Sequence, residues 1–227
     1  MRVPYAEMPR LMTLLTGDEK HWASATSTLD ALWVLYDRIL RVDPENPRAE
    51  DRDRMLLSKG HGPMAYYATL CARGFLDEDV LSTFARYDSQ LGGHPDRTLV
   101  PGVDISSGSL GHGLPLAVGM TLGLRAKGNA TSRVYCLVGD AELDEGTNHE
   151  AIVAAARFGL DRLHVVVVDN QSASLGWPGD GIAARFQVEG WSADTVDGRD
   201  HVALERALTA SHTGRPTATV AVVEKKA

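Results

Sequence analysis

The chain has 227 residues, of which 44% are hydrophobic and 23% charged, and its formal net charge is −7. This is the composition of an ordinary globular protein, and its acidic balance argues against a general electrostatic attraction to nucleic acid or to an anionic membrane. No apolar run reaches the roughly 18 residues that a membrane span needs, and the N-terminus lacks the apolar stretch of an export signal. Two cysteines, Cys71 and Cys136, are typical of reduced thiols, so we expect a cytoplasmic protein.

The first half of the chain reads as helices separated by irregular segments. Residues 63–73 and 78–87 are expected to be helical, and residues 113–127 to form a buried helix. Charged or Gly- and Pro-rich composition predicts loops at 43–53 and 90–108. A further helix over 27–42 would place six apolar side chains on one face: Leu29, Leu32, Trp33, Tyr36, Ile39 and Leu40.

The second half alternates short apolar runs with helical patterns. Strands are expected at 133–139, 164–168, 191–196 and 217–223, with helices over 148–158 and 202–211. Continuous apolar strands that alternate with helices indicate a parallel sheet covered on both faces. We therefore expect an α/β fold, in which residues 1–227 form a single three-layer domain with a mostly parallel sheet.

Two polar side chains follow neighbouring strands of this expected sheet. Asp140 comes directly after the first apolar run, and Asn170 lies 30 residues further on, after the next. Because the carboxyl ends of parallel strands meet at one edge, both side chains should emerge where open α/β sheets bind ligands. Their oxygens suit Mg²⁺. The alternative is that Asp140 caps the helix near Thr147 and Asn170 turns a loop.

A glycine-rich turn precedes the buried helix. Gly108, Gly111 and Gly113 could present backbone N–H groups to a diphosphate at the helix N-terminus. The alternative is a tight turn that packs the helix against a strand. The spacing matches neither a Walker loop nor a dinucleotide fingerprint, which weakens a nucleotide-binding hypothesis.

Taken in order, these motifs resemble the transketolase family. Residues 139–146 (GDAELDEG), followed by 168–171 (VDNQ), resemble its thiamine-diphosphate motif. Residues 58–62 (SKGHG), 92–95 (GGHP) and 108–113 (GSLGHG) resemble three further transketolase segments, and His21 stands nine residues before Asp30, where transketolases carry a histidine. The resemblance implies the thiamine-diphosphate-binding fold of a diphosphate-binding domain.

The resemblance also implies a site. Asp140, Asn170 and the backbone carbonyl of Ser172 match residues that hold Mg²⁺ or Ca²⁺. His21, His61 and His94 match histidines that bind ketose hydroxyls and move protons. Glu145 matches a carboxylate that helps link the cofactor sites of two partner domains. The residues that match cofactor-binding positions are His61, Gly108, Leu110, Gly111, Gly139, Ala141, Glu142, Glu145 and Asn170.

The remaining histidines receive a simpler interpretation. We interpret His149, His164, His201 and His212 as exposed helix or strand-edge residues. His112 stands where many relatives have Gln, and contact with cofactor or substrate stays an open alternative there.

Three features depart from the family pattern. Ala141 replaces a glycine, which would be unfavourable if this position needed positive φ. Trp22 follows His21 where the family has Pro-Gly, and the chain ends just after the last expected strand. A full transketolase adds a pyrimidine-binding and a C-terminal domain, which do not fit in 227 residues. We therefore expect the N-terminal subunit of a split transketolase, active only with a C-terminal subunit that carries the pyrimidine-binding domain, in an α2β2 heterotetramer.

The expected reaction is transfer of a two-carbon ketol group from a ketose or ketose phosphate to an aldehyde or related acceptor. One alternative is a thiamine-diphosphate subunit that delivers a two-carbon unit from a ketose or 2-oxo acid to a carrier. Another is a non-catalytic scaffold that retains the fold, and a third is a nucleotide-binding α/β module.

Overall fold

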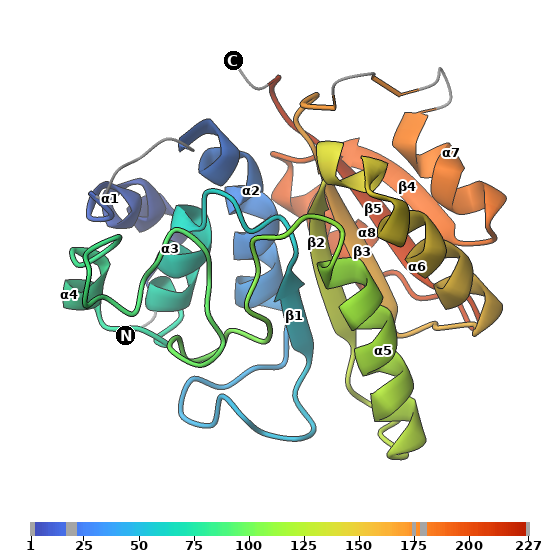
Figure 1. The fold of residues 1–227 in the computed structure, drawn as a ribbon, viewed down its shortest axis with the longest axis horizontal. Coiled ribbons are helices and arrows are strands. Elements are labelled where there is room, and N and C mark those ends of the chain that lie inside the picture. The colour runs from blue at the N-terminus through green and yellow to red at the C-terminus, as the bar shows by residue number, and fades with distance from the viewer. Residues whose placement is uncertain (1–2, 17–21, 174–175, 178–180, 226–227) are drawn as a thin grey trace.

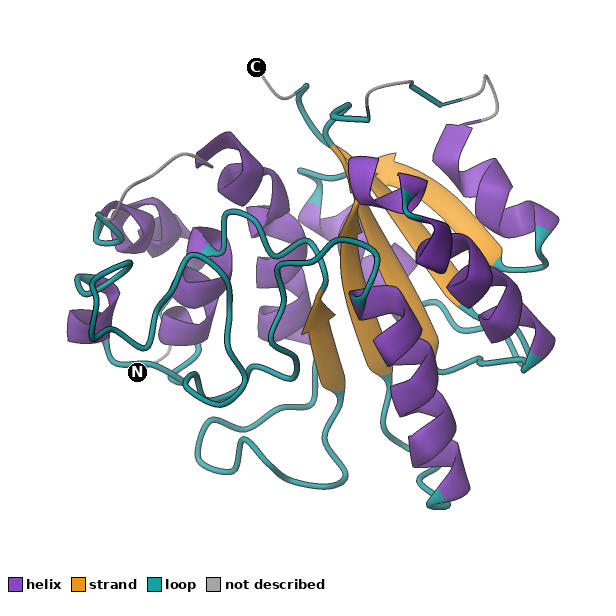
Figure 2. Ribbon diagram, viewed as in Figure 1, coloured by secondary structure: helices purple, strands orange, loops and turns teal. Residues whose placement is uncertain are grey.

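A parallel sheet between two layers of helices forms the centre of the molecule (Figures 1 and 2). The computed structural model describes residues 3–16, 22–173, 176–177 and 181–225. Within these residues the five-stranded sheet has the order β1-β2-β3-β5-β4, and every neighbouring pair is parallel. The α/β fold expected from the sequence is confirmed. The strands are β1 (Arg54–Leu57), β2 (Val134–Gly139), β3 (Leu163–Asp169), β4 (Ser192–Asp197) and β5 (Thr217–Val222).

Each face of the sheet is covered by its own group of helices. On one face, α2 (Trp22–Val34) and α8 (His201–Thr209) contact the sheet. Helix α3 (Met64–Ala72) packs against α2, and α1 (Met8–Thr13) and α4 (Glu78–Leu81) pack against α3, all within one core. The other face packs against α5 (Gly113–Ala126), α6 (Gly146–Arg157) and α7 (Gly181–Val188). Successive strand side chains point to opposite faces: in β2, Tyr135 and Leu137 join the first core, whereas Cys136 and Val138 join the second. In the described part of the chain, no helix is long and apolar enough to cross a membrane.

The first long helix is buried on more sides than the single apolar face that the sequence predicts. It begins at Trp22, earlier than expected, and continues from α2 into a π-helical turn, η2 (Leu35–Ile39). The six predicted apolar residues are all buried, but so are Ala31, Val34 and Leu35 on other sides of the helix. The reason is that α2 lies between the sheet and α3, so it has no wide solvent-facing side.

Several elements differ from the sequence-based expectation. The helix predicted over 78–87 ends at Leu81, because the chain reverses at Ala85, where φ is +60° and the N–H donates to the carbonyl of Leu91 at 2.8 Å. Strand β1, helices α1 and α7, and the short 3₁₀ turn η1 (Tyr5–Glu7) were not predicted. Each is short, and the four residues of β1 contain no β-branched side chain, so local pattern does not identify them.

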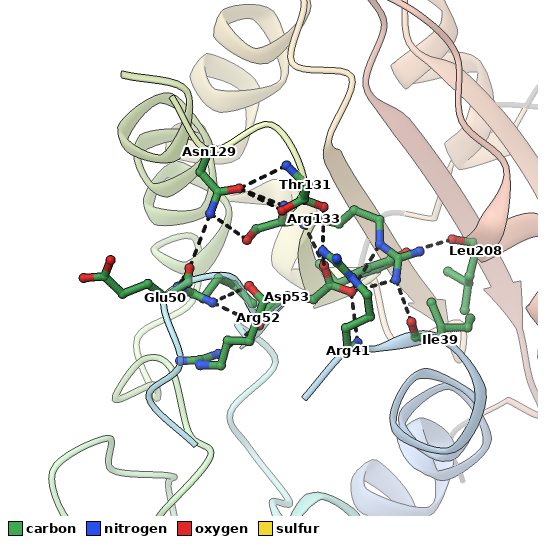
Figure 3. Close-up of polar contacts among 12 residues, drawn as sticks. Ile39, Arg41, Glu50, Arg52, Asp53, Asn129, Thr131, Arg133 and Leu208 are labelled. Carbon is green, nitrogen blue, oxygen red and sulfur yellow. Dashed lines mark hydrogen bonds and ion pairs between the residues drawn. The ribbon is translucent and has the colours of Figure 1, made fainter. Parts of the chain in front are cut away.

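Strand β1 is held at the edge of the sheet by the buried carboxylate of Asp53 (Figure 3). This carboxylate accepts hydrogen bonds from the backbone N–H groups and the guanidinium groups of Arg41 and Arg133, at 2.6–3.2 Å. Burial acts to raise the pKa of Asp53, but the two arginines outweigh it and the pKa is lowered. The Asp53 carboxylate therefore joins three segments: the loop before β1, the residues after η2 and the start of β2.

Candidate active site

Asp140 and Asn170 occupy the carboxyl ends of two adjacent strands. Asp140 follows β2 and Asn170 follows β3, and these strands pair up to Gly139 and Val168 (Figure 1). Asp140 is fully buried and Asn170 is 2% exposed. Parallel pairing thus brings to one edge two oxygen-bearing side chains that lie 30 residues apart in the sequence.

The Asp140 carboxylate organises the turn after Asn170. It accepts hydrogen bonds from the backbone N–H of Ser172 at 2.6 Å, from the Ser172 hydroxyl at 2.6 Å and from the N–H of Ala173 at 3.0 Å. The chain reaches this position because Gln171 adopts a left-handed φ of +54°. The helix-cap alternative for Asp140 is wrong, because Glu145 occupies the N-cap of α6.

Asn170 has a buried oxygen that needs a partner. Its Oδ1 makes no hydrogen bond among the described residues, although a buried acceptor without a partner costs stability. Burial raises the pKa of the adjacent Asp169, and the Asp140 charge adds to that effect. A cation at this edge would satisfy the amide oxygen and offset the negative charge, so the residues fit a divalent metal. The described residues contain no cluster of three or more His, Cys, Asp and Glu side chains able to hold a metal.

The glycine turn before α5 uses two of its N–H groups within the protein. The Gly111 N–H donates to Glu142 Oε1 at 3.1 Å, and the Gly113 N–H donates to Ser58 Oγ at 3.0 Å. These two N–H groups are therefore not available to a diphosphate, and the tight-turn alternative describes them better. Gly108 adopts a φ of +143°, and a Cβ there would lie 3.0 Å from the His94 ring.

Two of the three predicted catalytic histidines lie side by side. The rings of His61 and His94 meet edge to face, with centroids 4.9 Å apart, although 33 positions separate them in the sequence. His21 lies outside the described residues. His112 precedes α5 on the surface, and its Nδ1 lies 3.0 Å from the carbonyl oxygen of Leu110, which is half-buried.

The substitution at Ala141 causes no backbone conflict. Asp140 has a φ of −59°, and Ala141 opens a 3₁₀ turn, η3 (Ala141–Asp144). Among the described residues, only Ala85 and Gln171 combine a side chain with positive φ. The glycine of the family pattern is thus not required by the backbone at Ala141, and the expected difficulty does not arise.

Glu142 and Glu145 have different environments within the same motif. Glu142 is 2% exposed, and burial raises the pKa of its carboxyl, while hydrogen bonds from Ser58, Gly111 and Gly139 oppose this rise. Glu145 is exposed and packs beside Gly111, where an added Cβ would lie 2.7 Å from the Glu145 Cβ. Sequence reasoning assigned no role to Ser58; the signal available was its place at the start of a His-containing motif.

Two histidines interpreted as exposed are buried or paired. His164 is 3% exposed in β3, and its ring stacks on Tyr135, because this strand lies in the middle of the sheet. His201 places its Nε2 2.7 Å from Asp30 Oδ1, which also accepts a hydrogen bond from the Tyr5 hydroxyl. The exposed interpretation was wrong for both: His164 lies in a central strand, and packing of α2 and η1 against the start of α8 gives His201 its partner.

Comparison with known proteins assigns the chain to a family. Residues 15–224 match the family model described as "Transketolase, thiamine diphosphate binding domain". Ferredoxin fas2 of Rhodococcoides fascians is 53% identical over 98% of this chain and 73% of its own length. One of the apulose-4-phosphate transketolase subunits, from Actinobacillus succinogenes, is 39% identical over 70% of this chain. The structure of transketolase from Campylobacter jejuni aligns over 98% of this chain with a TM-score of 0.78 and 25% identity.

The matches have different lengths from this chain. It spans 58% of the relative from A. succinogenes and 38% of the C. jejuni chain. The ferredoxin name belongs to that relative, of which this chain covers 73%, and an iron–sulfur cluster is generally held by four cysteines. Here the two cysteines are free, buried and on opposite faces of the sheet. The family match covers most of the chain, the fold agrees, and the motif residues meet at the carboxyl edge, so the chain belongs to the transketolase family through its thiamine-diphosphate-binding domain.

Proposed function

We propose that residues 1–227 form, as one domain, the thiamine-diphosphate-binding subunit of a transketolase-type transferase. It moves a two-carbon ketol group from a ketose donor to an aldehyde or related acceptor. The observation that carries this proposal is the buried, unpartnered Oδ1 of Asn170 at the strand edge that also holds the buried carboxylate of Asp140. A protein without a cation at this edge would gain stability by giving that oxygen a partner.

The cation is Mg²⁺ or Ca²⁺, held by Asp140, by Asn170 and by the backbone carbonyl of Ser172. Both metals prefer oxygen ligands, and Mg²⁺ usually takes further ligands from phosphate and water. Thiamine diphosphate, when bound, would supply a carbon nucleophile and an electron sink for cleaving the C–C bond of the ketose and forming the new bond to the acceptor. The other residues proposed to bind this cofactor are His61, Gly108, Leu110, Gly111, Gly139, Ala141, Glu142 and Glu145, of which Gly111 and Glu142 contribute by shaping the site.

Histidines perform the proton transfers in this proposal. His61 and His94 lie in contact, on segments that converge at Gly108. An imidazole can both donate and accept a hydrogen bond, so the pair can bind ketose hydroxyls and exchange protons with them. His21 is assigned the same role from its motif position.

The other wall of the site comes from a partner. The relative from A. succinogenes is named as one subunit of its transketolase, and this supports assembly with a C-terminal transketolase subunit that carries the pyrimidine-binding domain, in an α2β2 heterotetramer. The same name supports a phosphorylated ketose as the donor. With a net charge of −7, the chain must meet that phosphate through local donors. Its free, buried thiols suit the cytoplasm.

The test is to co-express the chain with a candidate partner that carries the pyrimidine-binding domain, and to measure binding of thiamine diphosphate with and without Mg²⁺. Ketol transfer is then assayed from several ketose phosphates. Asn170→Ala is the sharpest variant, because its Oδ1 has no partner among the described residues and folding loses no hydrogen bond from it. Asp140→Asn is the second variant. The matched control is Asp194→Asn, an exposed carboxylate in β4.

We expect Asn170→Ala and Asp140→Asn to weaken metal-dependent cofactor binding at least about tenfold, and Asp194→Asn to leave it unchanged. The isolated chain should show no ketol transfer. Unchanged activity in both site variants would refute the metal assignment, and substantial activity of the isolated chain would refute the need for a partner. An assembled complex that binds no thiamine diphosphate would favour the scaffold alternative, and activity on a 2-oxo acid alone would favour the carrier alternative.

A further inference from the structure

The carboxylate of Glu142 connects three separate segments of the site. Its Oε1 accepts hydrogen bonds from the Ser58 hydroxyl and from the Gly111 N–H, and its Oε2 accepts one from the Gly139 N–H at 3.2 Å. It is 2% exposed. Burial of a carboxylate costs folding free energy unless it is hydrogen-bonded, and these three donors provide the hydrogen bonds.

Ser58 extends the same chain of hydrogen bonds. Its hydroxyl donates to Glu142, and its oxygen accepts from the Gly113 N–H at 3.0 Å. Ser58 is also buried, and it lies 84 positions before Glu142 in the sequence. A continuous path therefore runs from Gly113 through Ser58 to Glu142, and from there to Gly139.

The three connected segments carry the proposed site residues. Residues 58–62 follow β1 and contain His61. Residues 108–113 lead into the first residue of α5 and contain Gly108. Residues 139–145 begin at the last residue of β2 and contain Asp140. Strand pairing anchors the base of the first segment beside the third, because the N–H groups of Ser58 and Lys59 donate to the Leu137 carbonyl of β2 at 2.9 and 3.1 Å. Residues 108–113 lie outside the sheet and have no such anchor. Their position relative to the other two segments depends on side chains and on close packing.

The first two segments also lie in close backbone contact. A Cβ on Gly113 would lie 2.8 Å from the Ser58 Cα, and one on Gly60 would lie 2.9 Å from the Gly108 backbone nitrogen. The Thr147 hydroxyl also donates to the Gly111 carbonyl at 2.6 Å, but the hydrogen bonds through Ser58 and Glu142 are the ones that join all three segments.

We propose that Ser58 and Glu142 are positioning residues that couple the three segments into one cooperative unit, so that loosening one segment loosens the other two. Neither side chain needs to touch the cofactor or the substrate. The significance of the unit for cofactor binding rests on the proposed function, whereas the coupling itself does not.

A carboxylate suits this position better than an amide. Three donors converge on Glu142, and the two carboxylate oxygens can accept from all of them. In Glu142→Gln a single oxygen remains, so the amide nitrogen must face a donor. In Ser58→Ala the link to Gly113 disappears, but Gly111 and Gly139 keep their direct bonds to Glu142.

Amide hydrogen exchange of the full chain, followed residue by residue by NMR, tests the coupling. Ser58→Ala is expected to speed exchange at Gly113, its direct partner, and also at Gly111 and Gly139, by about tenfold or more. Glu142→Gln should do the same at Gly113, which it does not contact. In the unsubstituted chain, the three glycine amides should open together, with the same dependence on low denaturant concentration.

Ser107→Ala is the matched control, because its buried hydroxyl lies beside the same segments and has no partner among the described residues. It should leave the three glycine amides unchanged, and the Val166 amide in β3 reports that each variant stays folded. The proposal is overturned if each substitution affects only its direct partners, if the three amides of the unsubstituted chain open independently, or if Ser107→Ala has the same effect.

Binding in the assembled complex separates this inference from the proposed function. Ser58→Ala should raise the Kd for thiamine diphosphate at least about tenfold, with kcat at saturating cofactor within about twofold, since a positioning residue acts through others. Coupled exchange with unchanged Kd would overturn the positioning role. If the unsubstituted complex binds no thiamine diphosphate, the proposed function fails and with it the positioning role, while the exchange data still decide whether the segments are coupled.

Discussion

Protonation of His164 should destabilise the protein in mild acid. His164 is the second residue of β3, and it is 3% exposed. Its ring centroid lies 4.7 Å from that of Tyr135. Burial, aided by the positive charge of Arg133 and opposed by the Asp53 carboxylate, lowers the pKa of His164 from 6.5 to about 4. Its Nδ1 has no partner among the described residues, so nothing there stabilises a charged ring.

The sign follows from the two pKa values. The unfolded chain binds a proton at His164 below about pH 6.5, whereas the folded chain does so only near pH 4. The stability associated with the neutral ring is therefore fully present above pH 6.5 and is lost as pH falls toward 4. At about 1.4 kcal/mol per pH unit, the whole difference is about 3 kcal/mol, of which about 2 kcal/mol is lost between pH 7 and pH 5.

Urea unfolding at pH 7, 6 and 5 measures this loss. His164→Phe keeps an aromatic ring against Tyr135 but cannot bind a proton, so its stability should fall by about 2 kcal/mol less than that of the unsubstituted chain between pH 7 and pH 5. His112→Gln, an exposed position before α5, should follow the unsubstituted chain. The reasoning is refuted if His164→Phe shows the same loss, or if NMR titration gives His164 a pKa near 6.5.

Three further substitutions test the packing around the site and the sheet edge. Gly111→Ala should lower the free energy of unfolding in urea by at least about 2 kcal/mol, because φ is +81° and the new Cβ would lie 2.6 Å from the Thr147 hydroxyl. The control Gly119→Ala, with open space on α5, should not lower it. Asp53→Asn should cost about 1–3 kcal/mol, since an amide has one oxygen and cannot accept all the hydrogen bonds that Arg41 and Arg133 donate to the buried carboxylate. Equal stability of Asp53→Asn and the exposed control Asp51→Asn would contradict the role of the network. Ala141→Gly should lower stability by about 0.5–1 kcal/mol, and a gain in the same assay would show that the position prefers positive φ.

Long, strongly patterned elements were predicted well from the sequence. The apolar runs of β2, β3 and β5 and the helices α5 and α6 lie within a few residues of their expected bounds. Such runs are buried on both faces of a parallel sheet, so their composition alone indicates their place. The shared position of Asp140 and Asn170 at one edge was predicted from the same regularity. Between them, one helix and one parallel strand return the chain to the edge that it left.

Contacts between distant segments could not be predicted in this way. The sequence showed a glycine turn and assigned its N–H groups to a phosphate, whereas the fold gives two of them to Ser58 and Glu142. The exposed interpretation of His201 failed for a related reason, because its partner Asp30 lies 171 positions away. A side chain's partner depends on which segments pack together, and no local pattern records that.

The sequence by itself determined the family, the alternation of buried strands with helices, and the edge of the sheet where the motif residues emerge. These depend on residue order and hydrophobic period, which are local properties of the chain. Only the tertiary structure decided that β1 completes the sheet, that Ala141 needs no positive φ, that His164 is buried, and that Asn170 keeps an unpartnered oxygen at the strand edge. Each of these depends on burial and hydrogen-bond geometry among residues far apart in sequence, and those are settled only when the whole chain packs.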